Sequence, residues 1–270
     1  MNWKPLHDAH SIEQVRVVAQ FKESLPEKAV TKASSDVVER SDELLLPQKQ
    51  KIATGVMSID LSKQLGVGGL SVPAKQMPPV NSGWRLCRSE DQVLVEEVAF
   101  RDIAFSYFTS EYGRWENTRG RLSEVFIPAL TKALEATDLA TLRLEYWDSF
   151  ICEGDLPDAS EVINQINPAV PETALKGEEF WHSHCGWFEY FGETQVLVNK
   201  NIDFVESEIQ AKRVKTLKMY TLVEARVEQS DIAGEAVLGL LDQLHARSVA
   251  IFGSSITEPY RKRIDLELKE

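Results

Sequence analysis

The sequence predicts an α+β protein built from two halves that share one curved antiparallel sheet. Two observations predict this fold class. Apolar residues alternate with polar ones in several consecutive segments, as in half-buried strands, and they recur every three or four residues in two longer segments, as on one face of a helix. Strands in succession, followed by a helix that covers their sheet, are typical of this class. We therefore expect residues 1–139 and 140–270 to form two halves of one compact unit, each with one long helix on the shared sheet.

In the first half, a strand is expected at residues 11–21, where apolar side chains alternate, and a helix at residues 27–45. Four glycines and three prolines within residues 66–83 predict a long loop. The clearest helix covers residues 114–136, and Pro128 predicts a kink or a break inside it. Further strands are expected at residues 51–61, 84–88, 92–99 and 104–109.

The second half repeats this order of elements, although no residue-level repeat is visible. A strand is expected at residues 141–151 and a long helix at residues 231–252. Ser230 or Asp231 would cap this helix, and Gly253 would end it. The other expected elements are a short helix at residues 158–165, strands at residues 180–191, 195–205 and 216–227, and a final short helix after Thr257.

The paired order of strand, short helix, strands and long helix resembles the duplicated topology of TATA-binding proteins. That resemblance concerns topology alone, because the chain has no basic face of the kind that binds DNA in that fold. The chain has 270 residues, 30 Lys and Arg against 42 Asp and Glu, and a formal net charge of −12. A charge of this sign argues against a protein that coats nucleic acid or an anionic membrane.

Composition also bears on location. No apolar segment reaches the length of a transmembrane helix, and residues 1–20 lack the apolar core of a signal peptide. The three cysteines, Cys87, Cys152 and Cys185, are far apart in the sequence, which predicts reduced thiols. We therefore expect a cytoplasmic protein.

The negative charge is concentrated in residues 140–210. This segment contains 3 basic and 14 acidic residues, a net charge of −11, and 10 of the 23 aromatic residues. Residues 1–139 carry −2 and residues 211–270 carry +1. A segment that is both acidic and aromatic is typical of a surface for a basic or amphipathic protein partner. The alternative is an acidic, solvated face over an aromatic core.

The densest aromatic run lies at residues 180–191, where six of twelve residues are aromatic. We expect a protein partner to contact the acidic and aromatic side chains in and beside this run. The candidate partner-binding residues are Glu178, Glu179, Trp181, Trp187, Glu189, Tyr190 and Glu193.

The same run offers a metal site as an alternative. His182 and His184 are two residues apart, so on a strand their imidazoles would face the same side. Together they could bind a metal ion, with Glu178 or Glu189 as a further ligand, whereas Cys185 would face the opposite side. In that case the protein would be a metal-assisted enzyme that uses His182 and His184.

Other patterns predict no catalytic residue and no cofactor. Gly66, Gly68 and Gly69 resemble a phosphate-binding loop only superficially, because no Lys-Ser/Thr pair follows them. Adjacent carboxylates such as Glu96 and Glu97 face opposite sides of a strand and cannot act together. The basic residues 261–263 are best explained by the preference of cations for the end of a helix.

The C-terminal residues carry one family resemblance. The pattern Leu-His-x-Arg-x4-Phe-x2-Ser-Ile-Thr runs from Leu244 to Thr257 and includes His245, Arg247 and Ser255. It resembles the terminal signature of an uncharacterised, sporadically distributed prokaryotic family of about 250 residues. Trp115 at the head of the mid-chain helix, and Leu142, Leu144 and Tyr146 in the strand after it, agree with this family in outline. The chain departs from it at Glu145, Asp148 and Ser149, and at Ser248, Val249 and Ala250.

The resemblance implies no established activity, but a patchy distribution suggests a mobile or defence-associated gene context. Together with the acidic, aromatic segment, it leads us to expect a non-catalytic, cytoplasmic protein-binding component. Such a component would act as an accessory or inhibitory subunit of a defence or toxin-type system. The alternatives are a nucleic-acid-linked component of a defence complex and the metal-assisted enzyme.

Overall fold

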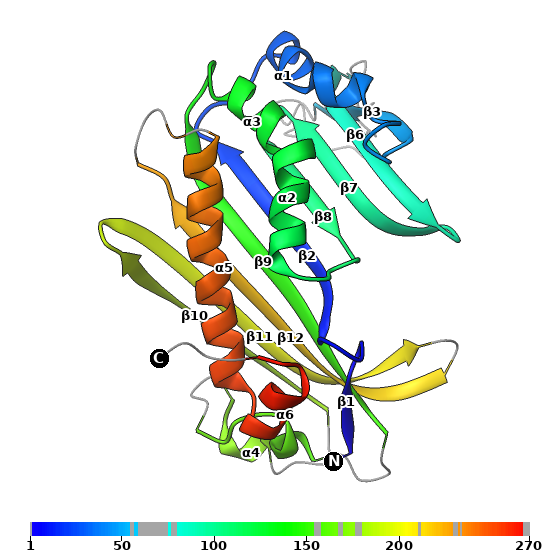
Figure 1. The fold of residues 1–270 in the computed structure, drawn as a ribbon. Helices are drawn as coiled ribbons and strands as arrows, with labels where there is room; N and C mark the ends of the chain where they lie inside the picture. Colours follow the sequence, from blue (N-terminus) through cyan, green and yellow to red (C-terminus); the bar gives the residue numbers. More distant parts are fainter. Residues whose placement is uncertain are drawn as a thin grey trace, which may run out of the picture.

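The protein is an α+β fold in which helices cover one face of a large antiparallel sheet (Figure 1). The computed structural model describes residues 2–54, 57–58, 75–76, 80–153, 158–166, 170–175, 180–209, 212–228, 232 and 234–266. The expected mixed fold class and the large antiparallel sheet are confirmed. Among the described helices, none is long and apolar enough to cross a membrane.

Two strands at the centre of the sheet join its two sides. β2 (Ile12–Phe21) pairs antiparallel with β9 (Leu139–Cys152), and Val17 lies opposite Leu144. Beyond β2 the sheet continues through β8 (Ala104–Thr109), β7 (Val93–Arg101), β6 (Val80–Glu90) and β3 (Gln48–Thr54). Beyond β9 it continues through β12 (Lys212–Arg226), β11 (Thr194–Ile209) and β10 (Trp181–Phe191). The short strand β1 (Trp3–Pro5) pairs with the last residues of β9, and β4 (Met57–Ser58) pairs with β5 (Lys75–Gln76) separately.

The helices lie on the same side of the sheet (Figure 1). α5 (Glu235–Ser255) packs on β9 and β12, and α1 (Glu27–Glu39) packs on β6 and β7. α2 (Trp115–Val125) and α3 (Ile127–Ala133) lie between them. Two short helices, α4 (Glu172–Leu175) and α6 (Glu258–Arg263), lie near the end of the sheet where β1 pairs.

Apolar side chains form two cores. The main core lies between the sheet and the helices and includes Val17, Leu144 and Leu244. The second core surrounds Trp3 and includes Phe150 and, from α5, Phe252. One helix therefore contributes to both cores, because its 21 residues extend beyond the main one.

Several helix boundaries differ from the sequence predictions. The predicted helix at residues 114–136 is broken into α2 and α3, and Pro128 is in the first turn of α3. Backbone N–H groups in the first turn have no acceptor within the helix, so a proline there costs no hydrogen bond. α5 begins at Glu235 after Gly234, rather than at residue 231, and it continues through the buried Gly253 to Ser255. Among the described helices α5 is therefore the one long helix that covers the sheet.

Other differences are local. α1 ends at Glu39, and turns that include Leu45 in the left-handed region (φ 56°) replace the rest of the predicted helix. The short helix expected at residues 158–165 is a single 3-10 turn, Ala159–Glu161. The expected loop at residues 66–83 overlaps β5 and the first residues of β6, while Gly66, Gly68 and Gly69 lie outside the described residues.

Candidate functional site

Strand β10, which ends the sheet, carries most of the residues predicted to bind a partner. Its side chains alternate between half-buried and exposed along the whole strand. Trp187 and Phe191 pack against the main core and Trp181 against the second core, so this set of side chains faces the helices. The other set, which includes Phe188 and Tyr190, faces away from the helices. We call the sheet face that is turned away from the helices the outer face.

The predicted partner-binding residues therefore do not share one surface. Trp181, Trp187 and Glu189 lie on the helix side, because they occupy odd positions of a strand with a two-residue period. Tyr190 lies on the outer face, and Glu193 is exposed in the turn that follows β10. Glu178 and Glu179 lie outside the described residues. The most exposed aromatic side chains of the strand are Phe188 and Tyr190, and the prediction included only Tyr190.

Glu189 connects β10 to the long helix. The Arg247 guanidinium donates from Nε to Glu189 Oε1 at 2.5 Å and from Nη2 to Oε2 at 2.7 Å. The two side chains are 37% and 20% exposed, so water weakens this bidentate pair only in part. The acidic side chain predicted to meet a partner is thus held by the arginine of the C-terminal signature.

Replacement of Arg247 with alanine is expected to lower the free energy of unfolding by about 1 to 2 kcal/mol, because two charge-assisted hydrogen bonds are lost. Amide hydrogen exchange in β10 should accelerate in this variant. The matched control is Lys262→Ala, which removes an exposed i,i+4 pair with Glu258. It should change stability by less than about 0.5 kcal/mol. Equal effects of the two substitutions would show that the Arg247 pair contributes nothing specific.

The two histidines of β10 lie on the outer face. His182 contacts Asp203 through Nδ1, and His184 Nε2 lies 3.3 Å from Asn199 Oδ1. The two imidazole rings are 6.4 Å apart, and both side chains are exposed. Among the described residues, no group of three or more His, Cys, Asp or Glu is arranged to hold a metal ion. Of the two carboxylates expected as a further ligand, Glu189 lies on the helix side of the strand, and Glu178 lies outside the described residues.

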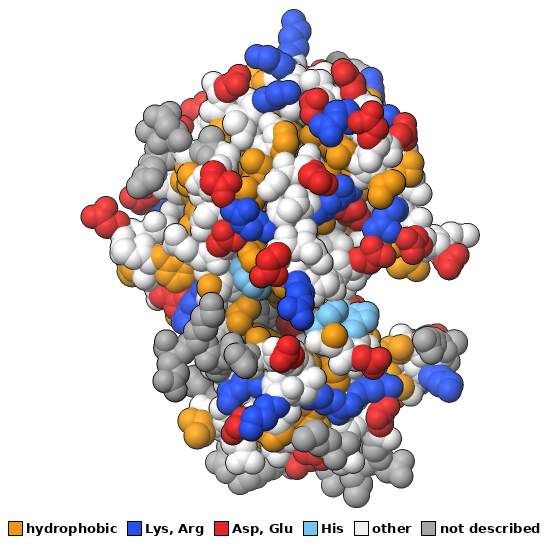
Figure 2. Space-filling view, viewed as in Figure 1, with side chains coloured by type: hydrophobic (Ala, Val, Ile, Leu, Met, Phe, Trp, Pro, Cys, Tyr) orange, Lys and Arg blue, Asp and Glu red, His pale blue; other side chains and the backbone are white. Residues whose placement is uncertain are grey.

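A cavity of about 700 Å³ lies on the helix side of the sheet. It is built from six segments that are distant in the sequence: residues 9–12, residues 112–116 at the start of α2, β9, β12, α5 and residues 263–266. Figure 2 shows the molecule hollowed between its upper and lower parts, with histidine side chains on either side of the hollow. No site in this region was predicted from the sequence.

Aromatic rings form one wall of the cavity. The rings of Trp115 and His245 are stacked, with centroids 4.4 Å apart and planes at 9°. A hydrogen bond of 2.9 Å joins Tyr146 Oη to His245 Nδ1, and Tyr112 meets the Tyr146 ring edge-on at 5.9 Å. Trp115 Nε1 donates to Asp242 Oδ1 at 2.7 Å, which fixes the indole. Burial lowers the pKa of His245 to about 4, so this imidazole is neutral at neutral pH.

A carboxyl group lies buried in this cavity. Asp148 is 3% exposed, and Ser11 Oγ donates to its Oδ1 at 2.7 Å. Burial raises the pKa of Asp148 to about 7, and the hydrogen bond from Ser11 opposes this shift only in part. No ion pair joins Asp148 to a basic side chain in the part of the chain that the structure describes.

Two further polar atoms of the cavity lining are buried without a hydrogen-bond partner among the described residues. They are Thr221 Oγ1 and His10 Nδ1. Thr221 is 1% exposed and lies directly across from Tyr146 on the neighbouring strand. Buried polar atoms in proteins are nearly always hydrogen-bonded, so these two can accept hydrogen bonds from a molecule in the cavity.

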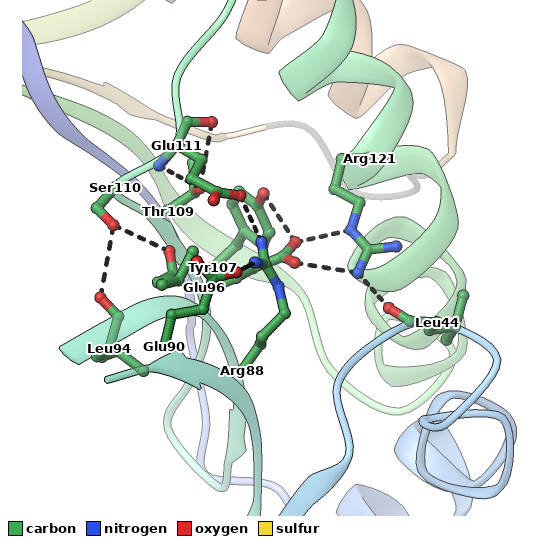
Figure 3. Close-up of polar contacts among 11 residues, drawn as sticks. Leu44, Arg88, Glu90, Leu94, Glu96, Tyr107, Thr109, Ser110, Glu111 and Arg121 are labelled. Carbon is green, nitrogen blue, oxygen red and sulfur yellow. Dashed lines mark hydrogen bonds and ion pairs between the residues drawn. The ribbon is translucent and has the colours of Figure 1, made fainter. Parts of the chain in front are cut away.

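A largely buried ion pair holds α2 against the sheet (Figure 3). The Arg121 guanidinium donates to both oxygens of Glu96, at 2.7 and 3.1 Å, and Tyr107 Oη donates to Glu96 Oε1 at 3.1 Å. Arg121 also donates to the carbonyl oxygen of Leu44, in the turn after α1. Glu96 is only 5% exposed. This network fixes the position of α2, whose first residues line the cavity.

The remaining residues of the C-terminal signature have structural contacts. Lys200, buried on β11, donates to Ser255 Oγ, and Thr257 Oγ1 donates to the carbonyl oxygen of Glu161 at 2.6 Å. Basic side chains of α6 are engaged as well: Arg263 donates to the carbonyl oxygen of Trp3 at 2.7 Å, and Arg261 donates to that of Gly253 at 3.1 Å. Arg261 thus contacts the last turn of α5, and Arg263 contacts β1.

Comparison of the chain with models of known protein families, with curated proteins and with solved structures found no match in any of the three.

Proposed function

We propose that the protein is a non-catalytic protein-binding component, an accessory or inhibitory subunit of a defence or toxin-type system in the cytoplasm. Its binding surface is the outer face of β10 and the turn that follows it. The single observation that carries the proposal is a pair of large apolar side chains at this end strand, Phe188 and Tyr190, which are 64% and 65% exposed. Exposed aromatic residues two apart on one strand are the kind of contact on which protein interfaces depend.

The position of β10 supports an extended partner. In the described part of the sheet β10 is the last strand on its side, so a partner segment can lie beside it in the manner of an added strand. Alternate side chains of such a segment would then contact Phe188 and Tyr190.

Charge favours a basic or amphipathic segment. Glu193 is exposed in the turn that follows the strand, and residues 140–210 as a whole carry −11. Basic side chains on the partner would be attracted to this part of the molecule, most strongly at low ionic strength.

Replacement of both Phe188 and Tyr190 with serine is expected to abolish co-purification of the partner from the native host. Both side chains are largely exposed, so the fold should be retained. The matched control replaces two equally exposed apolar residues elsewhere, Val93 and Ile103, with serine. A partner retained by the wild type and the control but lost from the β10 variant supports the proposal. Equal recovery from all three contradicts it, as does binding of the identified partner that strengthens with added salt.

We also infer that the two halves are a structural duplication. The central strands β2 and β9 are each the first long strand of their half, and they pair with each other. On its other edge, each pairs with the last strand of its own half: β2 with β8, and β9 with β12. A helix then follows each of these last strands. This shared order supports the expected pseudo-repeat, in which α2 and α3 together correspond to α5.

A further inference from the structure

We propose that the cavity beside Asp148 binds a small organic molecule through a protonated primary amino group. This site is separate from the outer face of β10, because the cavity is on the helix side of the sheet. The inference does not depend on the function proposed for that face.

The carboxyl group of Asp148 has a neutral partner and no cation among the described side chains. Asp148 is 3% exposed, and its partner among the described side chains is the neutral hydroxyl of Ser11. A buried carboxylate with no cation beside it is unfavourable and requires a positive partner or a proton. A ligand ammonium group would supply that partner, and the cavity offers the space for it.

The cavity lining also offers acceptors for the remaining N–H donors of an ammonium group. An amino group in its protonated form has three N–H donors and no acceptor. Thr221 Oγ1 is a buried acceptor without a partner among the described residues. Thr221 lies two residue pairs along the β9–β12 ladder from Asp148, so the two side chains share one face of the sheet. His10 Nδ1, also buried and without a described partner, is a third acceptor when the other ring nitrogen carries the proton. The Asp148 carboxylate, Thr221 Oγ1 and His10 Nδ1 can thus accept the three hydrogen bonds that an ammonium group donates.

Aromatic rings in the cavity lining would contact the rest of the ligand. Tyr112, Tyr146 and the stacked pair of Trp115 and His245 line the cavity with rings. Aromatic faces attract cations and bind apolar groups, so they favour an amine carried on an aromatic or aliphatic body. A volume of about 700 Å³ is of the size that holds such a small molecule.

The test uses the full chain and two pairs of probes. Each pair contains an amine and its neutral alcohol counterpart: 2-phenylethylamine with 2-phenylethanol, and 1,5-diaminopentane with 1,5-pentanediol. Isothermal titration calorimetry at pH 8 should detect binding of at least one amine, at least tenfold tighter than its alcohol. Asp148→Asn should weaken this binding at least tenfold, and Thr221→Val should weaken it severalfold.

The matched control is Asp91→Asn, which removes an exposed carboxylate in the turn between β6 and β7, outside the cavity. It should bind the amine within twofold of the wild type. The proposal is overturned if neither amine binds the wild type at millimolar concentration, or if Asp148→Asn and Asp91→Asn weaken binding equally. Asp148→Asn is expected to fold, as argued below, so loss of binding will not reflect loss of structure. A circular dichroism spectrum of each variant checks this.

Discussion

The variant Arg121→Met is expected to lose about 3 to 5 kcal/mol of its free energy of unfolding, because it leaves the Glu96 carboxylate buried without its cation. Glu96 is 5% exposed, and Arg121 supplies both of its ion-pair hydrogen bonds. Methionine retains most of the volume of the arginine stem, so lost packing contributes little. Urea denaturation, followed by tryptophan fluorescence, measures the change.

A second variant separates the buried charge from the rest of the network. In Arg121→Met combined with Glu96→Gln, no charge is buried, and the amide still accepts a hydrogen bond from Tyr107. We expect this double variant to regain about half of the lost stability or more. The exposed pair of Arg40 and Asp36 provides the comparison, and Arg40→Met should cost less than about 1 kcal/mol. If the single and double variants are equally unstable, the buried charge is not the cause.

The variant Asp148→Asn is expected to be more stable than the wild type by about 2 to 4 kcal/mol at pH 8. Folding raises the pKa of this carboxyl from 3.8 to about 7, so the folded state holds a proton that the unfolded state has released. Stability from this group is therefore greatest at low pH and falls as the pH rises from about 4 to about 7. Above about pH 7 the carboxylate is ionised and buried in the folded protein, so the whole free-energy penalty of its burial lowers the stability.

The measurement is urea denaturation of both proteins between pH 4 and pH 8. The stability difference should shrink below about 1 kcal/mol at pH 4, because Asp148 is then protonated in the folded protein. The Ser11 hydroxyl can still donate to the asparagine oxygen. Asp265→Asn, at an exposed position, should stay within about 0.5 kcal/mol of the wild type throughout. A pH-independent difference between Asp148→Asn and the wild type would contradict the assigned cause.

The sequence predicted strands better than helix ends. The alternation of Val15, Val17 and Ala19 fixes a strand locally, and β2 follows it closely. Gly253 was expected to end α5, but the helix continues to Ser255. At this end of the helix Phe252 packs in the second core and Lys200 of β11 donates to Ser255. Local propensity carries no information about such contacts between distant elements.

Part of the candidate site could be predicted from the sequence. Leu142, Leu144 and Tyr146 set a two-residue period, and the same period places Asp148 on the buried face of β9. The same two-residue period predicts that Trp187 and Tyr190, three residues apart on β10, lie on opposite faces of the sheet. The period could not show that Trp115 stacks on His245, because these residues are far apart in the chain and meet only through tertiary packing.

The cavity also has a consequence for how the protein matures. Its walls include residues 9–12 and residues 263–266, and Arg263 and Tyr260 both donate to the carbonyl oxygen of Trp3, at 2.7 and 3.3 Å. Hydrogen bonds between segments about 260 residues apart in the chain thus hold two walls of the cavity together. A contact of such long range forms late and slowly. A chain still emerging from the ribosome can complete most of its sheet before it is able to hold a ligand.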